Sequence, residues 1–265
     1  MSDDPIPITL TFSRDGVVAP ALRAMRRATE IIAFTLNSMA DADLSVSPRP
    51  TNNVLFGLQF GDEPEGYDRR SDFTDWVLER GFRDIAHGAR AALEEAYLYI
   101  DFARDMPGQT TMGELEERFD RVRKAASRVN FMQLLDAVNA GLTEPLSFND
   151  EFLSLQKARN CLEHRHGIVS EKDADHGNGM RLALPRLKSF FMRDGEEVEL
   201  ERGQFFEAET AISIRRDTRE RFFAIGSRVT FSAEEFDEIA MACWFFASDL
   251  SQKLPAIVPS NASAP

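Results

Sequence analysis

The chain has 265 residues, of which 43% are hydrophobic and 28% charged, and its formal charge at pH 7 is −13. This acidic balance argues against a protein that holds long nucleic acid mainly by neutralising phosphates, because such proteins are usually basic. We expect no membrane-spanning segment and no secretory signal. Two cysteines make no disulfide framework, so we expect a reducing, cytoplasmic location.

The N-terminal part of the sequence predicts two long helices. Apolar residues recur at helical spacing over 19–40. A segment rich in proline, glycine and aspartate follows, and within it the run VLFGLQF, over 54–60, predicts a short strand. The second helical pattern covers 72–106, and we expect a break in it near Gly81.

Two further helices are predicted in the middle of the chain. A Thr-x-x-Glu capping box opens a segment over 111–140, because the threonine oxygen and the glutamate can satisfy each other's free backbone groups. Ser147 or Asn149 is the expected N-cap of the next helix. Gly167 is its expected end, since glycine is the preferred residue just past a helix C-terminus.

After this helix the pattern changes to that of β-strands. Apolar runs flank the pair Asp194-Gly195, which is a strong signal for a hairpin turn. The segment over 210–232 predicts two or three more short strands. A second capping box, over 232–235, then opens a last helix that stops before Pro255.

We therefore expect a mainly α protein, an up-and-down helical bundle with a small antiparallel β insert before the last helix. The predicted segments are an N-terminal helix with an irregular extension (1–70), a helical bundle (71–179), the β-rich insert (180–231), the final bundle helix (232–254) and a flexible tail (255–265).

The segment SLQKARNCLEHRHGIVS, over 154–170, is the densest group of reactive side chains in the chain. It holds two of the four histidines and one of the two cysteines. The wider stretch 156–193 carries eight Lys/Arg against four Asp/Glu and is a basic island in an acidic chain. An acidic protein with one such island can still bind RNA locally, but weakly and with strong sensitivity to salt.

The helical positions of these residues separate them into two faces. At 100° per residue, Asn160 and His164 share one strip, and Arg159 lies about 140° from His164. The two side chains can therefore converge only around a cleft or across a two-fold axis with a second copy. Three apolar residues form the stripe that we expect to face the core: Leu155, Ala158 and Leu162.

The run Arg159-Asn160-Cys161-Leu162-Glu163-His164 resembles the RX4-6H motif of the HEPN superfamily, which consists of small α-helical bundles that often dimerise. The RHGIV that follows also resembles the turn of many members. The resemblance implies an HEPN-like bundle over about 72–167 and 232–254. The N-terminal segment and the β insert are not part of the minimal family pattern.

The resemblance implies a metal-independent endoribonuclease without a cofactor. His164 would act as general base or acid at the ribose 2′-hydroxyl or the leaving oxygen, and Arg159 would bind the scissile phosphate. Asn160 would orient one of these groups, and Arg165 and His166 would add binding contacts. The implied product is a 2′,3′-cyclic phosphate, from a site between the two protomers of a homodimer. RNA and an antitoxin or another protein are the implied partners.

Two other interpretations of the motif stay open. Many HEPN-like proteins are non-catalytic binding or scaffold proteins, and Glu163 would repel phosphate if it faced the cleft. The motif also fits an ordinary helix end, because cations are favoured at a helix C-terminus and Arg159 can pair with Glu163 four residues on.

Other chemistry has less support in the sequence. Zinc binding would use a single cysteine and three histidines, namely Cys161, His164, His166 and His176. Cys161 as a nucleophile has no partner other than His164, and its place near the core stripe indicates packing. His87 stands alone in a predicted helix, and we expect it to be structural. The 21 phenylalanines fit core positions better than a platform for stacking bases.

Overall fold

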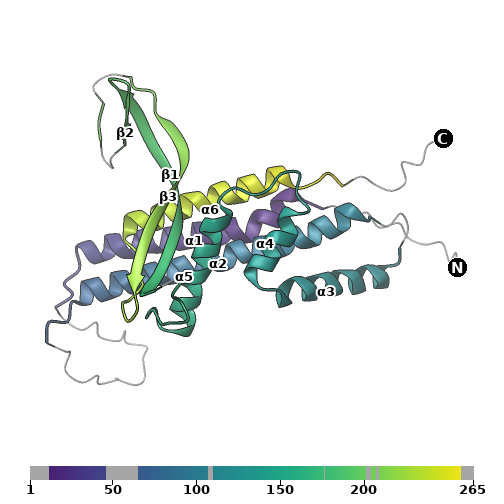
Figure 1. The fold of residues 1–265 in the computed structure, drawn as a ribbon, viewed down its shortest axis with the longest axis horizontal. Coiled ribbons are helices and arrows are strands. Elements are labelled where there is room, and N and C mark those ends of the chain that lie inside the picture. The colour runs from purple at the N-terminus through teal and green to yellow at the C-terminus, as the bar shows by residue number, and fades with distance from the viewer. Residues whose placement is uncertain are drawn as a thin grey trace.

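The computed structural model describes residues 12–45, 65–106, 110–175, 177–200, 204–206 and 209–257. Within them the chain forms six helices and one three-stranded antiparallel sheet (Figure 1). The predicted mainly helical architecture with a small sheet before the last helix is confirmed. No helix in this part of the chain is both long and apolar enough to cross a membrane. The strand predicted over 54–60 lies outside the described residues.

The helices are α1 (Arg14–Ala40), α2 (Arg69–Arg104), α3 (Met112–Arg128), α4 (Phe131–Asn139), α5 (Asn149–His164) and α6 (Ala233–Lys253). The strands are β1 (Gly179–Arg193), β2 (Glu196–Glu199) and β3 (Ser213–Ala224). Helices α1, α2 and α6 contact one another along the long axis of the molecule (Figure 1). The sheet crosses this bundle, and its β2 end projects beyond the helices.

Helix α2 is continuous, so the predicted break near Gly81 is wrong. A Cβ at this position would lie 2.3 Å from Cδ1 of Ile32 and 2.9 Å from the ring of Phe236. The glycine therefore permits close packing of α2 against α1 and α6 instead of interrupting the helix. Helix α1 begins at Arg14, earlier than predicted, because Ser13 caps it through the backbone N–H of Gly16.

The segment predicted as one helix over 111–140 is two helices. The capping box at its start is present, with both reciprocal hydrogen bonds. However, Val129 is extended and ends α3, and Asn130 then forms a second capping box with Gln133 that opens α4. Asparagine at the N-cap and glutamine three residues later carried this signal in the sequence.

The start of α5 also differs from the prediction, because neither Ser147 nor Asn149 caps it with a side chain. The N-cap is Phe148, a buried residue in the left-handed region (φ 61°) without a side-chain hydrogen bond. The backbone N–H of Ser147 donates to Asp249 on α6, and the Asn149 amide donates to the carbonyl of Leu146. Packing of the phenylalanine and these tertiary bonds set the start of the helix.

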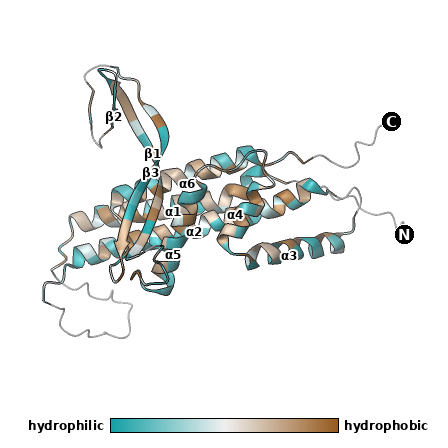
Figure 2. Ribbon diagram, viewed as in Figure 1, coloured by the Kyte–Doolittle hydropathy of each residue, from teal (hydrophilic) through white to brown (hydrophobic). Residues whose placement is uncertain are grey.

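One hydrophobic core joins most of the structure. Its buried side chains come from α1, α2, α4, α5, β1 and α6, so the N-terminal helix and the insert pack with the bundle. Helix α3 packs mainly through a smaller cluster with the end of α2. Each long helix carries both hydrophobic and hydrophilic residues (Figure 2), as expected for helices that bury one face.

The sheet has the order β2-β1-β3, and β1 contacts both α5 and α6. Asp194 and Gly195 have positive φ angles of 54° and 86°, which confirms the predicted hairpin turn between β1 and β2. Adjacent phenylalanines on a strand point to opposite faces of the sheet. Phe223 is buried, but its neighbour Phe222 stays 54% exposed and stacks with Arg181.

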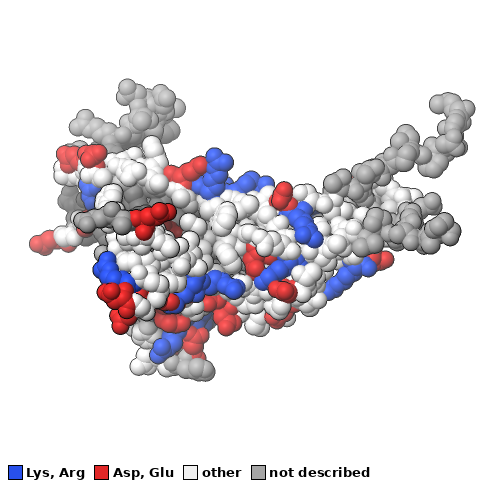
Figure 3. Space-filling view, turned by 90° about the horizontal axis from the view of Figure 1, so that it is seen from above, with Lys and Arg blue, Asp and Glu red and all other residues white. Residues whose placement is uncertain are grey.

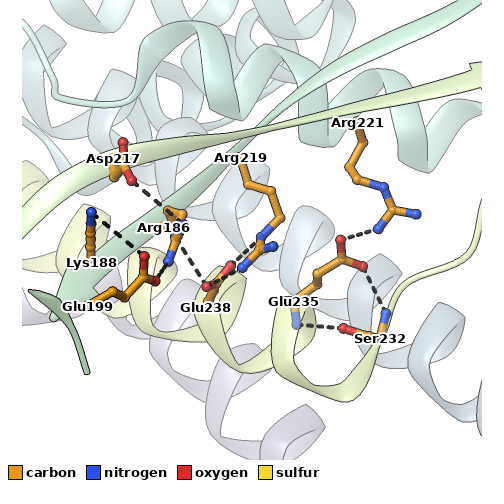
Figure 4. A network of polar contacts seen from close by, with 9 residues as sticks. All are labelled: Arg186, Lys188, Glu199, Asp217, Arg219, Arg221, Ser232, Glu235 and Glu238. Carbon is orange, nitrogen blue, oxygen red and sulfur yellow. Dashed lines mark hydrogen bonds and ion pairs between the residues drawn. The ribbon is translucent and has the colours of Figure 1, made fainter. Parts of the chain in front are cut away.

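A network of ion pairs holds the sheet against α6 (Figure 4). Arg186 on β1 lies among three carboxylates, those of Glu199, Asp217 and Glu238. Arg219 on β3 also donates to Glu238, at 2.7 and 2.8 Å. The predicted capping box at the start of α6 belongs to this surface and is confirmed. Because its charges are paired with one another, we interpret the network as a structural anchor.

Candidate functional site

The end of α5 is fixed by its own turn and by the loop before α6. The backbone N–H groups of Arg165 and Gly167 both donate to the carbonyl of Cys161. His166 and Gly167 have φ angles of 53° and 77°, so the left-handed turn begins one residue before the predicted glycine. Ile168 then forms a β-bridge with Arg228.

Arg159 of the predicted motif lies in a polar cluster between α2 and α5. Its Nη2 is 2.6 Å from Oε2 of Glu163, one turn along the same helix, and its Nη1 donates to the side-chain oxygen of Asn160 at 3.1 Å. Nε2 of His87, on α2, lies 2.5 Å from the other oxygen of Glu163. The cluster thus contains Arg159, Asn160, Glu163 and His87. Nε of Arg159 is buried and has no hydrogen-bond partner among the described residues.

The short contact between His87 and Glu163 decides which nitrogen carries a proton. A carboxylate oxygen can only accept, so Nε2 must be protonated and donate to it. Nη2 of Arg159, 3.2 Å from the same Nε2, is also a donor, and the two groups therefore share Glu163 instead of bonding to each other. These contacts do not involve Nδ1, the second ring nitrogen of His87. The His87 side chain is 51% exposed.

Glu163 is the electrostatic centre of this cluster. Its burial alone would raise its pKa, but the hydrogen bond from His87 and the positive charge of Arg159 outweigh burial and lower the pKa overall. Glu163 is therefore ionised at neutral pH, and it compensates the charge of the guanidinium. The ion pair predicted from the four-residue spacing is confirmed.

His164 does not join this cluster. It is exposed, and no hydrogen bond or ion pair connects it to Arg159. This matches the separation of the two residues on the helix, and one copy of the chain does not assemble the predicted Arg/His pair. His87 lies beside Arg159, which the sequence did not indicate, because the two residues are 72 positions apart.

The two predicted binding residues also differ in their surroundings. Arg165 forms an ion pair with Asp173, whose side chain is 2% exposed and accepts two further hydrogen bonds from Ser170. This guanidinium holds the turn after α5. His166 is exposed, two residues after His164.

The remaining candidates do not form a site with the motif. Among the described residues, no group of three or more His, Cys, Asp or Glu side chains is placed to hold a metal, and His176 lies outside them. Cys161 is buried at 0% exposure, and burial and the charge of Asp173 raise the pKa of its thiol. The indication that it is a packing residue is confirmed.

An apolar groove of about 600 Å³ lies between the end of α1 and the start of α2. Phe34 and Trp76 on its walls are 74% and 57% exposed. None of the motif residues lines it. Leu44, another wall residue, is followed closely by segment 46–64, which is outside the described residues.

Comparisons with protein-family models, with curated proteins and with solved structures found no match. The resemblance to the HEPN superfamily therefore depends on the motif and its place at the end of a bundle helix.

Proposed function

We propose that the chain is an HEPN-like, metal-independent endoribonuclease that acts as a homodimer. The observation that carries the proposal is the state of the two motif residues. His164 is exposed at the end of α5, and Arg159 is held one turn earlier by Asn160 and Glu163 with its Nε still unpaired. The imidazole of His164 is accessible to a substrate, and the partly exposed guanidinium of Arg159 keeps a second N–H on Nη1 and on Nη2 for a phosphate oxygen.

A second copy supplies what one chain lacks. Arg159 and His164 point to different sides of α5, so they do not meet within a chain. When two α5 helices lie across a two-fold axis, the arginine of each copy can face the histidine of the other, since a two-fold interface presents the same surface from both sides. Each dimer then has two composite sites.

The reaction uses a nucleophile that the RNA itself provides. An imidazole at His164 takes the proton of a ribose 2′-hydroxyl, whose oxygen attacks the adjacent phosphorus while the 5′-oxygen of the next nucleotide leaves and is protonated. Arg159 stabilises the charge that develops on the phosphate oxygens. The products are a 2′,3′-cyclic phosphate and a 5′-hydroxyl end.

The test compares the wild-type protein with His164→Ala on total RNA in the presence of EDTA. Wild-type protein is expected to produce 2′,3′-cyclic phosphate ends, and the variant, with an unchanged circular dichroism spectrum and elution volume, is expected to produce none. Equal amounts of cyclic phosphate from both proteins would contradict the role of His164.

One observation favours a second function, a non-catalytic HEPN-like binding or scaffold protein. The guanidinium of Arg159 is already compensated by Glu163 at 2.6 Å, as expected if the pair only stabilises the helix. In that case neither protein cleaves RNA, and both elute alike. A protein partner such as an antitoxin and a cytoplasmic location stay predictions.

A further inference from the structure

One stripe of α2 follows the last turns of α5. Glu79, Arg83 and His87 are spaced by four residues and so lie on the same side of the helix. At one end of the stripe, Glu79 binds Arg228 at 2.8 Å and faces Gly167, just past α5. At the other end, His87 binds Glu163 within α5. Arg83 therefore lies between these two contacts, one turn from each, beside the end of α5.

Arg83 differs from Glu79 and His87 in its contacts with the described part of the chain. Its Nε is buried without a hydrogen bond, and its guanidinium forms no ion pair or hydrogen bond with any described residue. The nearby carboxylates are already engaged: Glu79 by Arg228, Glu163 by Arg159 and His87, and Asp84 by Arg27. This arginine is thus a half-buried cation with which no described carboxylate forms an ion pair.

An anion with several oxygens is the ligand that such a group fits. A guanidinium offers five N–H donors in a planar fork that matches phosphate, and a partly desolvated cation gains more from an anion than an exposed one. The overall charge of −13 works against nucleic acid binding over the whole surface. On the face drawn in Figure 3, Lys/Arg and Asp/Glu side chains are interspersed instead of separated by sign. Anion binding must therefore be local.

We propose that Arg83 is a phosphate-binding residue, which holds a backbone phosphate of single-stranded RNA next to the end of α5. The choice of RNA as the ligand rests on the proposed function. Arg83 and His87 from α2 and Arg159 from α5 then line one side of the strand, and the backbone follows the boundary between the two helices. Arg83 binds the substrate and takes no part in proton transfer.

The test separates binding from cleavage by its choice of probe. A short fluorescein-labelled RNA with 2′-fluoro riboses has no 2′-hydroxyl and cannot form a cyclic phosphate, so its anisotropy in EDTA reports binding alone. Arg83→Gln is compared with Arg80→Gln, which removes the same charge one turn earlier on α2. Arg80 is a suitable control because it is exposed and stacks on Trp76.

We expect Arg83→Gln to weaken binding of the probe about tenfold, as for loss of one charge-assisted contact. For this variant, the slope of log K against log salt concentration should become less steep by about 0.7. This is the value for one phosphate contact on a single strand. Arg80→Gln should stay within about twofold of wild type. Arg83→Lys, which keeps the charge but loses the fork, should fall between them. Melting temperatures of all variants establish that they are folded.

The outcomes distinguish this inference from the proposed function. Binding that depends on Arg83 in a protein that cleaves no RNA supports the inference and contradicts the nuclease. Cleavage by a protein whose Arg83→Gln and Arg80→Gln variants bind the probe equally overturns the inference alone. A wild type that binds no probe also overturns it. Inorganic phosphate is the second arm: if it raises the melting temperature of wild type but not of Arg83→Gln, while the probe binds both equally, the ligand is a free phosphate and the RNA assignment is wrong.

Discussion

Glu163 holds Arg159 in place from one turn further along α5, with 2.6 Å between Oε2 and Nη2. The same carboxylate accepts a hydrogen bond from His87 of α2. Glu163, which lies inside the motif, thus fixes the position of Arg159 and partly neutralises its positive charge. Any ligand phosphate at this end of α5 must compete with Glu163 or bind beside it.

Replacing this carboxylate should strengthen RNA binding. Glu163→Gln keeps the size of the side chain but removes its charge. Two charges about 4 Å apart in water interact by about 1 kcal/mol, so the 2′-fluoro RNA probe should bind about fivefold more tightly. Glu30→Gln is the matched control, because Glu30 pairs with Arg26 at the same four-residue spacing on the exposed face of α1. Equal affinity for both variants would show that Glu163 does not face the bound RNA.

The turn after α5 should depend on the charge of Asp173. Burial alone would raise its pKa, but hydrogen bonds from the Ser170 backbone, Arg165 and the Ser170 hydroxyl, with the charge of Arg165, lower it overall. Asp173→Asn should therefore lower the free energy of unfolding by about 2–3 kcal/mol at neutral pH.

The pH dependence of this loss has a definite sign. A carboxyl group with a lowered folded-state pKa stabilises the protein fully above its unfolded pKa, and the stabilisation is lost as pH falls through the folded value. The difference in the free energy of unfolding between wild type and Asp173→Asn, measured by urea denaturation, should therefore be largest at neutral pH. It should shrink below about pH 4. A difference that grows on acidification would contradict the assignment.

Cys161 should be dispensable for RNA cleavage. It is buried with a raised pKa, and burial raises the pKa of Cys243 to about 12, so neither thiol is available as a nucleophile. Cys161→Ala should lower stability by about 1 kcal/mol and leave the yield of cyclic phosphate unchanged. Ellman's reagent should react with the thiols of the native protein only as fast as it unfolds. Loss of cleavage by a folded Cys161→Ala would restore the nucleophile interpretation.

The sequence predicted those features that neighbouring residues determine. The capping boxes at Thr111 and Ser232 and the turn at Asp194-Gly195 depend on bonds across two to four residues, and all three are present. The spacing of Arg159 and Glu163 predicted their ion pair for the same reason.

Features that depend on distant contacts could not be predicted in this way. A glycine such as Gly81 inside a helical pattern indicates a helix break, but here α1 and α6 pack closely against it. Phe148 starts α5 without a polar cap. His87 has no partner within its own helix, and only the folding of α2 against α5 brings it to Glu163. The boundary between α3 and α4 could have been predicted, because the residues of the Asn130–Gln133 capping box are visible in the sequence.

We propose that Arg159 of one copy and His164 of the other form one site, and mixing two inactive variants tests whether the site is shared. Arg159→Ala and His164→Ala are purified separately, unfolded and refolded together in equal amounts, and assayed on RNA in EDTA. About half of the dimers are then mixed, and each has one intact site, so about a quarter of the wild-type cleavage should return. Cleavage by wild type with none from the mixture would contradict a shared site.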